Sequence, residues 1–284
     1  MNHLLADRIT NIKPFYVMEL LQRAKMLEQQ GRDIIHMEIG EPDFKTPSAI
    51  VDASIKFIQS GDVHYTQASG LLLLREKIAA FYKQQYAVNI AAERIFITPG
   101  ASGALLLALG ATLNTGDKLL MADPGYPCNR NFVQLFGAEA KEIAVDASTH
   151  YHLNAGLIKQ HWDTQCKGVL IASPSNPTGT LINTATLQQS IAQVAALGGC
   201  FFSDELYHGL VYGQTATTAL QYSDEVFVIN SFSKFFGMTG WRIGWLIVPE
   251  AFIAAIEKLS QNLFIATSTP AQYAALTAFD KDNL

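Results

Sequence analysis

The stretch Gly168-Val169-Leu170-Ile171-Ala172 decides the fold of this chain of 284 residues. It is apolar throughout, and a strand without polar alternation is typical of a sheet that is buried on both faces. Ser173-Pro174 ends the run, and residues 184–197 then show a helical pattern. Because a doubly buried strand followed by a helix is the unit of a parallel sheet covered by helices, this stretch predicts an α/β domain.

The same order of strand and helix recurs along most of the chain. Before it begins, residues 16–30 have a helical pattern and residues 33–38 form a short extended segment. Thr46-Pro47 predicts the N-cap and first residue of a helix that runs to about residue 60. Another helix is expected over residues 71–86. Further on, we expect strands at 94–98, 118–122, 140–145, 168–172, 200–203 and 225–230, and helices at 101–113, 127–136 and 184–197.

Composition argues against several classes of protein. With 49% hydrophobic and 16% charged residues the chain can form a large core. Its net charge is −5 and no basic run is interleaved with aromatic residues, so we expect no nucleic-acid partner. The longest apolar run, residues 104–113, is shorter than the roughly 20 residues that cross a bilayer. Three widely spaced cysteines and the lack of a signal-peptide pattern predict a reducing, cytoplasmic location.

The sequence Ser231-Phe232-Ser233-Lys234, with Arg242 shortly after it, is the strongest chemical signal. A lysine attacks a carbonyl as the free amine, so a Schiff-base lysine needs a lowered pKa, which a nearby arginine helps to provide. The same guanidinium can bind a phosphate, and the serine hydroxyls can donate hydrogen bonds to phosphate oxygens. The motif therefore indicates a lysine that holds a phosphorylated aldehyde; solvated surface charges are the alternative.

Further candidates follow other predicted strands, because ligands gather at the carboxyl ends of the strands of such sheets. Ala101 and Ser102 belong either to a phosphate-binding turn at a helix N-terminus or to an ordinary turn that Ser102 caps. Asp204 follows an apolar strand, where a cation such as a pyridinium would balance its charge. A capping aspartate is the alternative at that position.

Three more side chains are candidates for contact with a planar ring. Tyr207 lies one helical turn after Asp204 and either offers its hydroxyl to a ligand or packs in the core. Asn176 lies in a proline-rich turn that would hold its amide in one orientation, and Tyr126 follows a strand and could stack on a ring. A plain turn is the alternative for Asn176. His208 has no metal-ligand spacing to another histidine, so we expect no metal site.

Five motifs in this order resemble the class I/II aminotransferases, which are pyridoxal-phosphate enzymes of fold type I, like aspartate aminotransferase. The motifs are Gly40-Glu41-Pro42-Asp43, Tyr65 with Gly70, Asn176-Pro177-Thr178-Gly179, Asp204-Glu205-Leu206-Tyr207 and Ser231-Phe232-Ser233-Lys234. The resemblance covers the chain from about residue 15 onward. It implies a three-layer α/β/α large domain with a mostly parallel sheet, and the transfer of an amino group from an L-amino acid to a 2-oxo acid in a homodimer.

The resemblance also implies a role for each candidate residue. Lys234 would form the aldimine with the cofactor and move the proton at the substrate α-carbon, and Asp204 would keep the ring nitrogen protonated. Gly40 would offer its backbone to the substrate carboxylate. The other implied cofactor contacts are Asn176 and Tyr207 at the ring oxygen, Tyr126 on the ring face, Ala101, Ser102, Ser231 and Arg242 at the phosphate, and Tyr65 at the phosphate of the neighbouring subunit.

One departure from the family pattern concerns its smaller domain. Family members carry a C-terminal segment with an arginine that binds the substrate carboxylate, whereas no arginine follows Arg242 here. We therefore expect an N-terminal arm and the first part of the small domain over residues 1–45, the large cofactor-binding domain over 46–284, and no C-terminal part of the small domain. A lyase or decarboxylase would use the same residues. A cofactor-binding or dimerisation module with little activity is the non-enzymatic alternative.

Overall fold

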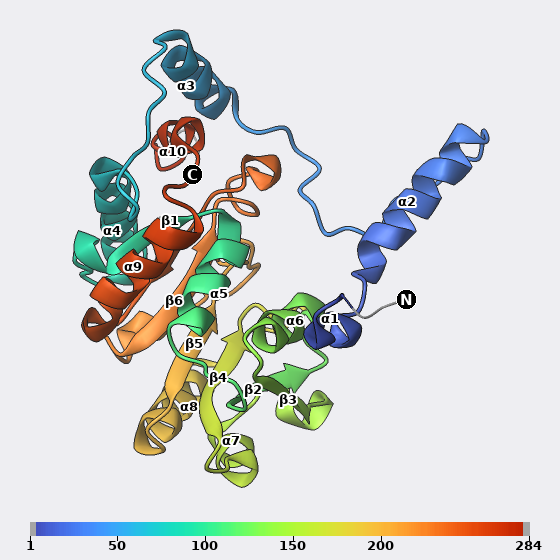
Figure 1. Ribbon diagram of the computed structural model, residues 1–284, viewed down its shortest axis with the longest axis vertical. Coiled ribbons are helices and arrows are strands. Elements are labelled where there is room, and N and C mark those ends of the chain that lie inside the picture. Colours follow the sequence, from blue (N-terminus) through green and yellow to red (C-terminus); the bar gives the residue numbers. More distant parts are fainter. Residues whose placement is uncertain (1–3, 281–284) are drawn as a thin grey trace.

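A single mixed sheet forms the centre of the molecule in the computed structural model, which describes residues 4–280 (Figure 1). Within these residues the sheet has seven strands in the order β1-β7-β6-β5-β4-β2-β3. Strand β7 is antiparallel to both of its neighbours, and the other pairs are parallel. The strands are β1 (Ile95–Thr98), β2 (Lys118–Asp123), β3 (Glu139–Ala144), β4 (Cys166–Ala172), β5 (Cys200–Asp204), β6 (Val226–Ser231) and β7 (Gly244–Ile247).

The central strands carry apolar residues at successive positions, and successive side chains of a strand point to opposite sides of the sheet. Both faces of the sheet are therefore apolar. In β6, Val226 and Val228 belong to one buried cluster, whereas Phe227 and Ile229 belong to another on the opposite face. The pattern confirms the sequence-based prediction of a mostly parallel sheet covered on both sides. It also gives the three-layer α/β/α arrangement that the resemblance implies.

The helices divide into two layers. The layer on the Phe227 face has α5 (Gly100–Gly110), α6 (Pro127–Leu135) and α9 (Ile253–Leu263). The opposite layer has α3 (Ser48–Gln59), α4 (Leu72–Tyr86), α7 (Ala155–His161), α8 (Thr184–Ala196) and α10 (Thr269–Ala275). Short 3-10 turns cover Ala92–Arg94, Ala147–Thr149, Ala219–Gln221, Thr239–Trp241 and Glu250–Phe252. Among residues 4–280, no helix combines the length and the apolarity needed to cross a membrane.

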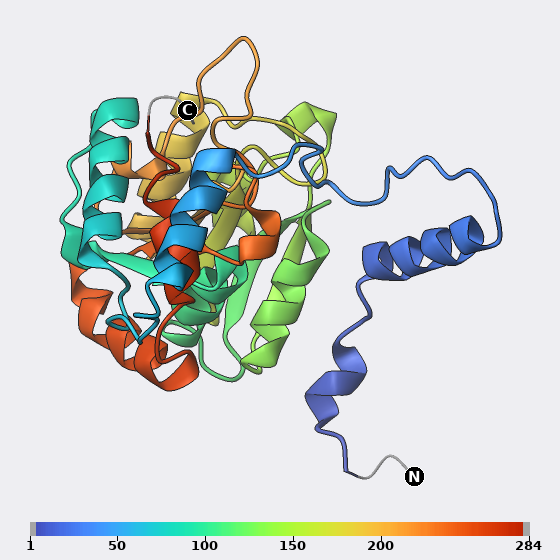
Figure 2. The same ribbon diagram turned by 90° about the horizontal axis from the view of Figure 1, so that it is seen from above.

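The N-terminal part of the chain lies beside this three-layer body. Figure 2 shows α1 (Asp7–Asn11) and α2 (Tyr16–Gln29) on an arm that extends away from it. Helix α2 forms where the sequence predicted a helix, yet it buries none of its residues within the described chain. The expected extended segment at residues 33–38 is not a strand in the structure, because no other strand of the described chain pairs with it.

A second difference concerns the start of α3. The sequence predicted Thr46 as its N-cap and Pro47 as its first residue, but the helix begins at Ser48 with Pro47 in the cap position. The Thr46 hydroxyl instead donates a hydrogen bond to the Gly237 carbonyl oxygen at 2.7 Å and accepts one from Trp241 Nε1 at 3.1 Å. A tertiary contact therefore uses the side chain that the local rule assigned to capping.

Candidate active site

The carboxyl ends of the parallel strands meet at one edge of the sheet and bring most of the predicted site residues there. Asp204 is the last residue of β5 and pairs in register with Ala172 of β4, just before the loop that carries Asn176. The lysine motif begins at Ser231, the last residue of β6, which is hydrogen-bonded beside β5. Three strand ends that are distant in sequence thus supply neighbouring side chains.

One end of this edge is formed by Arg242 and the N-terminus of α5. Gly100 has a φ of +68°, and a Cβ atom there would lie 2.4 Å from Arg242 Nη2. A Cβ on Gly244 would lie 3.1 Å from the Ala101 amide nitrogen and 2.7 Å from the Asn230 carbonyl oxygen. The two glycines therefore let the guanidinium and β7 lie directly against the first turn of α5, where backbone amides and the helix dipole favour an anion.

The two serines of the lysine motif are buried and linked to each other. Ser231 Oγ lies 2.9 Å from Ser233 Oγ and donates a hydrogen bond to the Ile243 carbonyl oxygen at 2.9 Å. The Ser233 amide in turn donates to Ser231 Oγ at 3.1 Å. Since a hydroxyl has a single hydrogen, Ser231 donates to either the Ser233 hydroxyl or the Ile243 carbonyl at any one time, and its hydrogen is engaged within the protein in both cases.

Lys234 reaches across the edge to the N-terminal segment. Its Nζ donates a hydrogen bond to the Gly40 carbonyl oxygen at 2.6 Å. Burial lowers the pKa of the Lys234 ammonium; the carboxylate of Glu41 opposes this shift, and the charge of Arg242 adds to it. The arginine therefore acts in the direction that the sequence predicted, but burial is the larger cause.

Asp204 and its neighbour Glu205 are carboxyl groups in apolar surroundings. Burial raises the pKa of Asp204 to about 6, although the Leu206 amide, which donates to Asp204 Oδ1 at 3.2 Å, opposes the shift. Glu205 is 1% exposed and its Oε1 accepts hydrogen bonds from Ser203, Thr218 and the Ala219 amide. A cation placed beside Asp204 would stabilise the ionised form that burial disfavours.

Asn176 and Tyr207 lie side by side, as expected if both face one ligand atom. Asn176 Nδ2 donates a hydrogen bond to the Tyr207 hydroxyl at 3.3 Å, which leaves the hydrogen of Tyr207 for another acceptor. Burial raises the pKa of Tyr207 and of Tyr126. The Tyr126 ring also makes an edge contact with Phe15 from the N-terminal segment, with ring centroids 6.0 Å apart.

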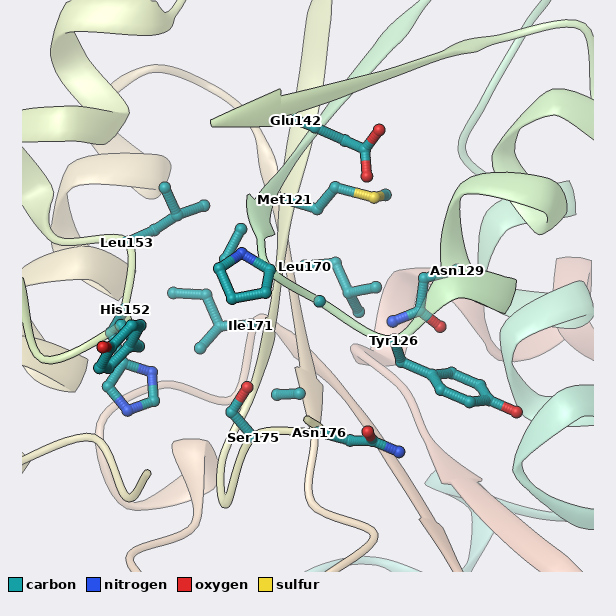
Figure 3. Close-up of a pocket in the computed structure, with 15 residues that line it drawn as sticks. Met121, Tyr126, Asn129, Glu142, His152, Leu153, Leu170, Ile171, Ser175 and Asn176 are labelled. Carbon is teal, nitrogen blue, oxygen red and sulfur yellow. The ribbon is translucent and has the colours of Figure 1, made fainter. Parts of the chain in front are cut away.

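A small cavity of about 30 Å³ lies behind Tyr126. Figure 3 shows Tyr126, Asn129 and Asn176 on one side of it and His152 on the other. Asn129 Oδ1 and His152 Nε2 are buried there without a hydrogen-bond partner among the described residues. Ligand pockets usually have volumes of several hundred Å³, so this cavity is too small for a phosphorylated ring and lies beside the candidate site.

Four predicted site residues are exposed in the structure, namely Gly40, Tyr65, Ser102 and Arg242. Tyr65 is 80% exposed and Ser102 is exposed at the start of α5. The sequence reasoning missed the contact between Glu41 and Thr239, whose hydroxyl donates to the Glu41 carboxylate, because these residues are far apart in the chain and carry no motif together. Among residues 4–280, no three His, Cys, Asp or Glu side chains gather so as to hold a metal ion.

Comparison with known proteins places this geometry in a family. Residues 32–284 match the family described as aminotransferase class I and II. The chain is 40% identical over 282 residues to the (5-formylfuran-3-yl)methyl phosphate transaminase of Methanocaldococcus jannaschii, covering 98% of this chain and 73% of that protein. It is 36% identical to the valine–pyruvate aminotransferase of Mycobacterium tuberculosis, covering 97% of this chain and 72% of that one.

Solved structures give the same result. An aminotransferase from Mycobacterium tuberculosis matches with a TM-score of 0.94 at 36% identity, covering 98% of this chain and 72% of that one. The aspartate aminotransferase of Thermotoga maritima matches with a TM-score of 0.93 at 34% identity, covering 98% of this chain and 75% of that one.

The chain therefore belongs to the class I and II aminotransferases. It is a pyridoxal-phosphate-dependent enzyme of fold type I that transfers an amino group between an amino acid and a 2-oxo acid. This confirms the expectations of fold, cofactor and reaction that the sequence motifs supported. The alternative of a lyase is not favoured, because these relatives are named as transaminases.

Proposed function

We propose that the carboxyl edge of this sheet is the active site, with Lys234 as the residue that holds the cofactor and moves the proton at the substrate α-carbon. The position of Lys234 Nζ carries this proposal. It is partly buried, its pKa is lowered, and Arg242 and Glu41 influence its charge. A lowered pKa gives a larger fraction of free amine near neutral pH, which is the form that reacts with a carbonyl and accepts a proton.

The groups at this edge fit pyridoxal phosphate. The guanidinium of Arg242, which Gly100 brings against α5, would bind the phosphate together with the amides of Ala101 and Ser102. Ser231 would also lie at the phosphate, positioned by the hydrogen bond from its hydroxyl to the Ile243 carbonyl. When bound, pyridoxal phosphate supplies an aldehyde that condenses with amines and a ring that withdraws electrons from the substrate carbon.

The remaining side chains would hold the ring. Asp204 would accept a hydrogen bond from the protonated ring nitrogen, and the positive charge there would lower the pKa that burial raises to about 6. Tyr207, which already accepts from Asn176, would donate its own hydrogen to the ring oxygen, and the second N–H of Asn176 would donate there too. Tyr126 would cover one face of the ring and exclude water from it.

Gly40 would serve the substrate. Its carbonyl oxygen accepts from Lys234, and an oxygen acceptor cannot bind a carboxylate, so the amide N–H of Gly40 is the group that we propose for the substrate carboxylate. Release of Nζ from the Gly40 carbonyl would free Lys234 for the substrate. Residues 1–45 would form the arm and first part of the small domain, and 46–284 the large domain.

We also propose a homodimer in which Tyr65 of one subunit reaches the phosphate bound by the other. The 80% exposure of Tyr65 supports this arrangement. Helix α2 buries nothing within the described chain and exposes several large apolar side chains, which are typical of a surface that meets another protein. These are Tyr16, Met18, Leu20 and Met26. We propose the cytoplasm as the location, which the three free cysteines support.

The test is to add pyridoxal phosphate to the purified protein, fix it with borohydride and map the labelled peptide. We expect the label on Lys234. A second sample receives amino acids before reduction; we expect the visible band to change and a 2-oxo acid to form. The relatives are named for substrates as different as valine with pyruvate, aspartate and a furan aldehyde phosphate, so valine, aspartate and related amino donors belong in the panel.

Matched controls make this experiment decisive. Lys234→Ala should lose the label and the amino transfer, while Lys258→Ala, a lysine on α9 away from the site motifs, should keep both. A label on another lysine in the unaltered protein would refute the role of Lys234. Release of carbon dioxide in place of a 2-oxo acid would indicate a decarboxylase.

A further inference from the structure

Tyr65 projects into solvent from a loop whose own backbone is fixed from within. Its side chain is 80% exposed, whereas Ala68, Ser69 and Gly70 of the same loop are buried. The Ser69 carbonyl oxygen accepts from the Ile97 amide of β1 at 2.9 Å, and the Ala68 carbonyl accepts from Ser260 Oγ at 2.9 Å. Because the backbone of the loop is already fixed, the exposed aromatic side chain can contact a group outside this chain without first ordering the loop.

Two residues of α10 hold the chain on both sides of Tyr65. Thr269 Oγ1 donates a hydrogen bond to the His64 carbonyl oxygen at 2.7 Å. Gln272 Nε2 donates to Thr66 Oγ1 at 3.0 Å. Thr269 and Gln272 are three positions apart, so their side chains lie on one face of the helix. Together they fix the residues immediately before and after Tyr65.

Gln272 is the more deeply placed of the two. It is 0% exposed, and every polar atom of its side chain has a partner. Besides Thr66, Nε2 donates to the Thr267 carbonyl at 2.8 Å, and Oε1 accepts from the Leu71 amide at 2.7 Å. Buried polar groups with all bonds made define one arrangement of the chain, because breaking any of them leaves a group unpaired.

Gly70 lets the loop come this close. It has a φ of +92°, and a Cβ atom there would lie 2.3 Å from the Ile97 side chain and 3.0 Å from Gln272 Oε1. Gly70, which the sequence motif pairs with Tyr65, therefore has a structural role in this chain. It allows the loop to pack between β1 and Gln272.

We infer that Gln272 is a positioning residue for Tyr65 and that, through Tyr65, it acts on cofactor binding in a second copy of this chain. The inference rests on the proposed homodimer with shared sites. Gln272 touches neither Lys234 nor Arg242 of its own chain in any hydrogen bond of the described residues. Its loss should therefore weaken the phosphate contact in the other subunit and leave the site of its own subunit intact.

The experiment uses hybrid dimers purified with two different affinity tags. Gln272→Met keeps the length of the side chain and removes its hydrogen bonds. In the first hybrid, the subunit with Gln272→Met keeps Lys234 and its partner carries Lys234→Ala. In the second hybrid, one subunit carries both changes and its partner is unaltered. Since only a subunit with Lys234 can be fixed by borohydride, the pyridoxal phosphate concentration for half-maximal labelling reports one known site in each hybrid.

We expect the second hybrid to need about tenfold more pyridoxal phosphate than a hybrid that carries Lys234→Ala alone, as for the loss of one hydrogen bond to a charged group. The first hybrid should match that reference. A purely structural role would weaken the site of the altered subunit itself or both sites equally, and either pattern would overturn the inference. Thr66→Val removes the hydroxyl that accepts from Gln272 and donates to the Gln67 carbonyl. It serves in the same hybrids if Gln272→Met does not fold, with an expected shift of about threefold.

The size of the unaltered protein in solution separates this inference from the proposed function. A monomer that is still labelled on Lys234 would overturn both the proposed homodimer and the role of Gln272, while leaving the role of Lys234 in place. A dimer in which Gln272→Met affects its own subunit would overturn only the role of Gln272. Tyr65→Phe combined with Gln272→Met should weaken binding no further than Tyr65→Phe alone, because both changes act through the same hydroxyl.

Discussion

Gly100 offers a way to move Arg242 without replacing it. In Gly100→Ala, the new methyl group would lie 2.4 Å from Arg242 Nη2 and 3.0 Å from its Cζ. These atoms form the far end of a flexible side chain that is exposed, so the guanidinium can swing away at little cost in packing. We therefore expect the substitution to displace the proposed phosphate ligand while the fold remains.

Two separate magnitudes follow. Gly100 has a φ of +68°, and a residue with a Cβ in this left-handed region costs about 1–2 kcal/mol of folding free energy. Displacing the guanidinium removes hydrogen bonds between charged groups, which contribute about 1.5–3 kcal/mol. That corresponds to an increase of about 10-fold to 100-fold in the dissociation constant for pyridoxal phosphate.

The matched control is Gly198→Ala. Gly198 has a similar φ of +71°, but a Cβ atom there would meet nothing within 4 Å. Both variants should lose similar stability in urea unfolding of the cofactor-free protein, and only Gly100→Ala should bind pyridoxal phosphate more weakly in a spectroscopic titration. Equal affinities for the cofactor in the two variants would refute the placement of Arg242 at the phosphate.

Two further predictions concern Asp204 and Thr46. The pKa of Asp204 is about 6, above its ordinary 3.8, so its contribution to stability is complete below about pH 4 and is lost as the pH rises through about 6. Cofactor-free Asp204→Asn should therefore be more stable than the unaltered protein at about pH 8, by about 3 kcal/mol, and the gap should close toward about pH 4; parallel pH profiles in urea unfolding would contradict this. Thr46→Val should lose about 1–3 kcal/mol of unfolding free energy, because the Gly237 carbonyl and Trp241 Nε1 lose their partner. Thr184→Val on the exposed start of α8 is its control, and equal unfolding midpoints would argue against the Thr46 contact.

Much of the fold follows from local pattern. The apolar run in β4 predicted a strand buried on both faces, and the strand-helix order predicted a parallel sheet, because burial and periodicity are properties of neighbouring residues. The sequence pattern did not predict strand β7. It has four residues, Gly244–Ile247. Although Gly240 and Pro249 lie near its ends, periodicity alone does not tell so short an apolar stretch from part of a buried helix.

The candidate site, like the fold, was only partly predictable from the sequence. The sequence by itself determined which chemical groups follow the strands, since Asp204, Asn176 and Lys234 each come within a few residues of the end of an apolar run, and the carboxyl ends of parallel strands share one edge. The sequence did not determine how these groups are arranged relative to one another. The guanidinium of Arg242 lies against the first turn of α5 because Gly100 leaves room for it, and Gly244 lets β7 approach the same turn.

Tertiary structure alone decided the contacts between distant parts of the chain. Lys234 reaches the Gly40 carbonyl across 194 positions and Gln272 reaches Thr66 across 206. Thr46 would be a good N-cap by local rules, but its hydroxyl is hydrogen-bonded to the Gly237 carbonyl and to Trp241 Nε1 instead. A hydrogen bond needs two groups within about 3 Å of each other, and for residues so far apart in sequence that distance depends on how the whole sheet and its helices pack, which no local pattern contains.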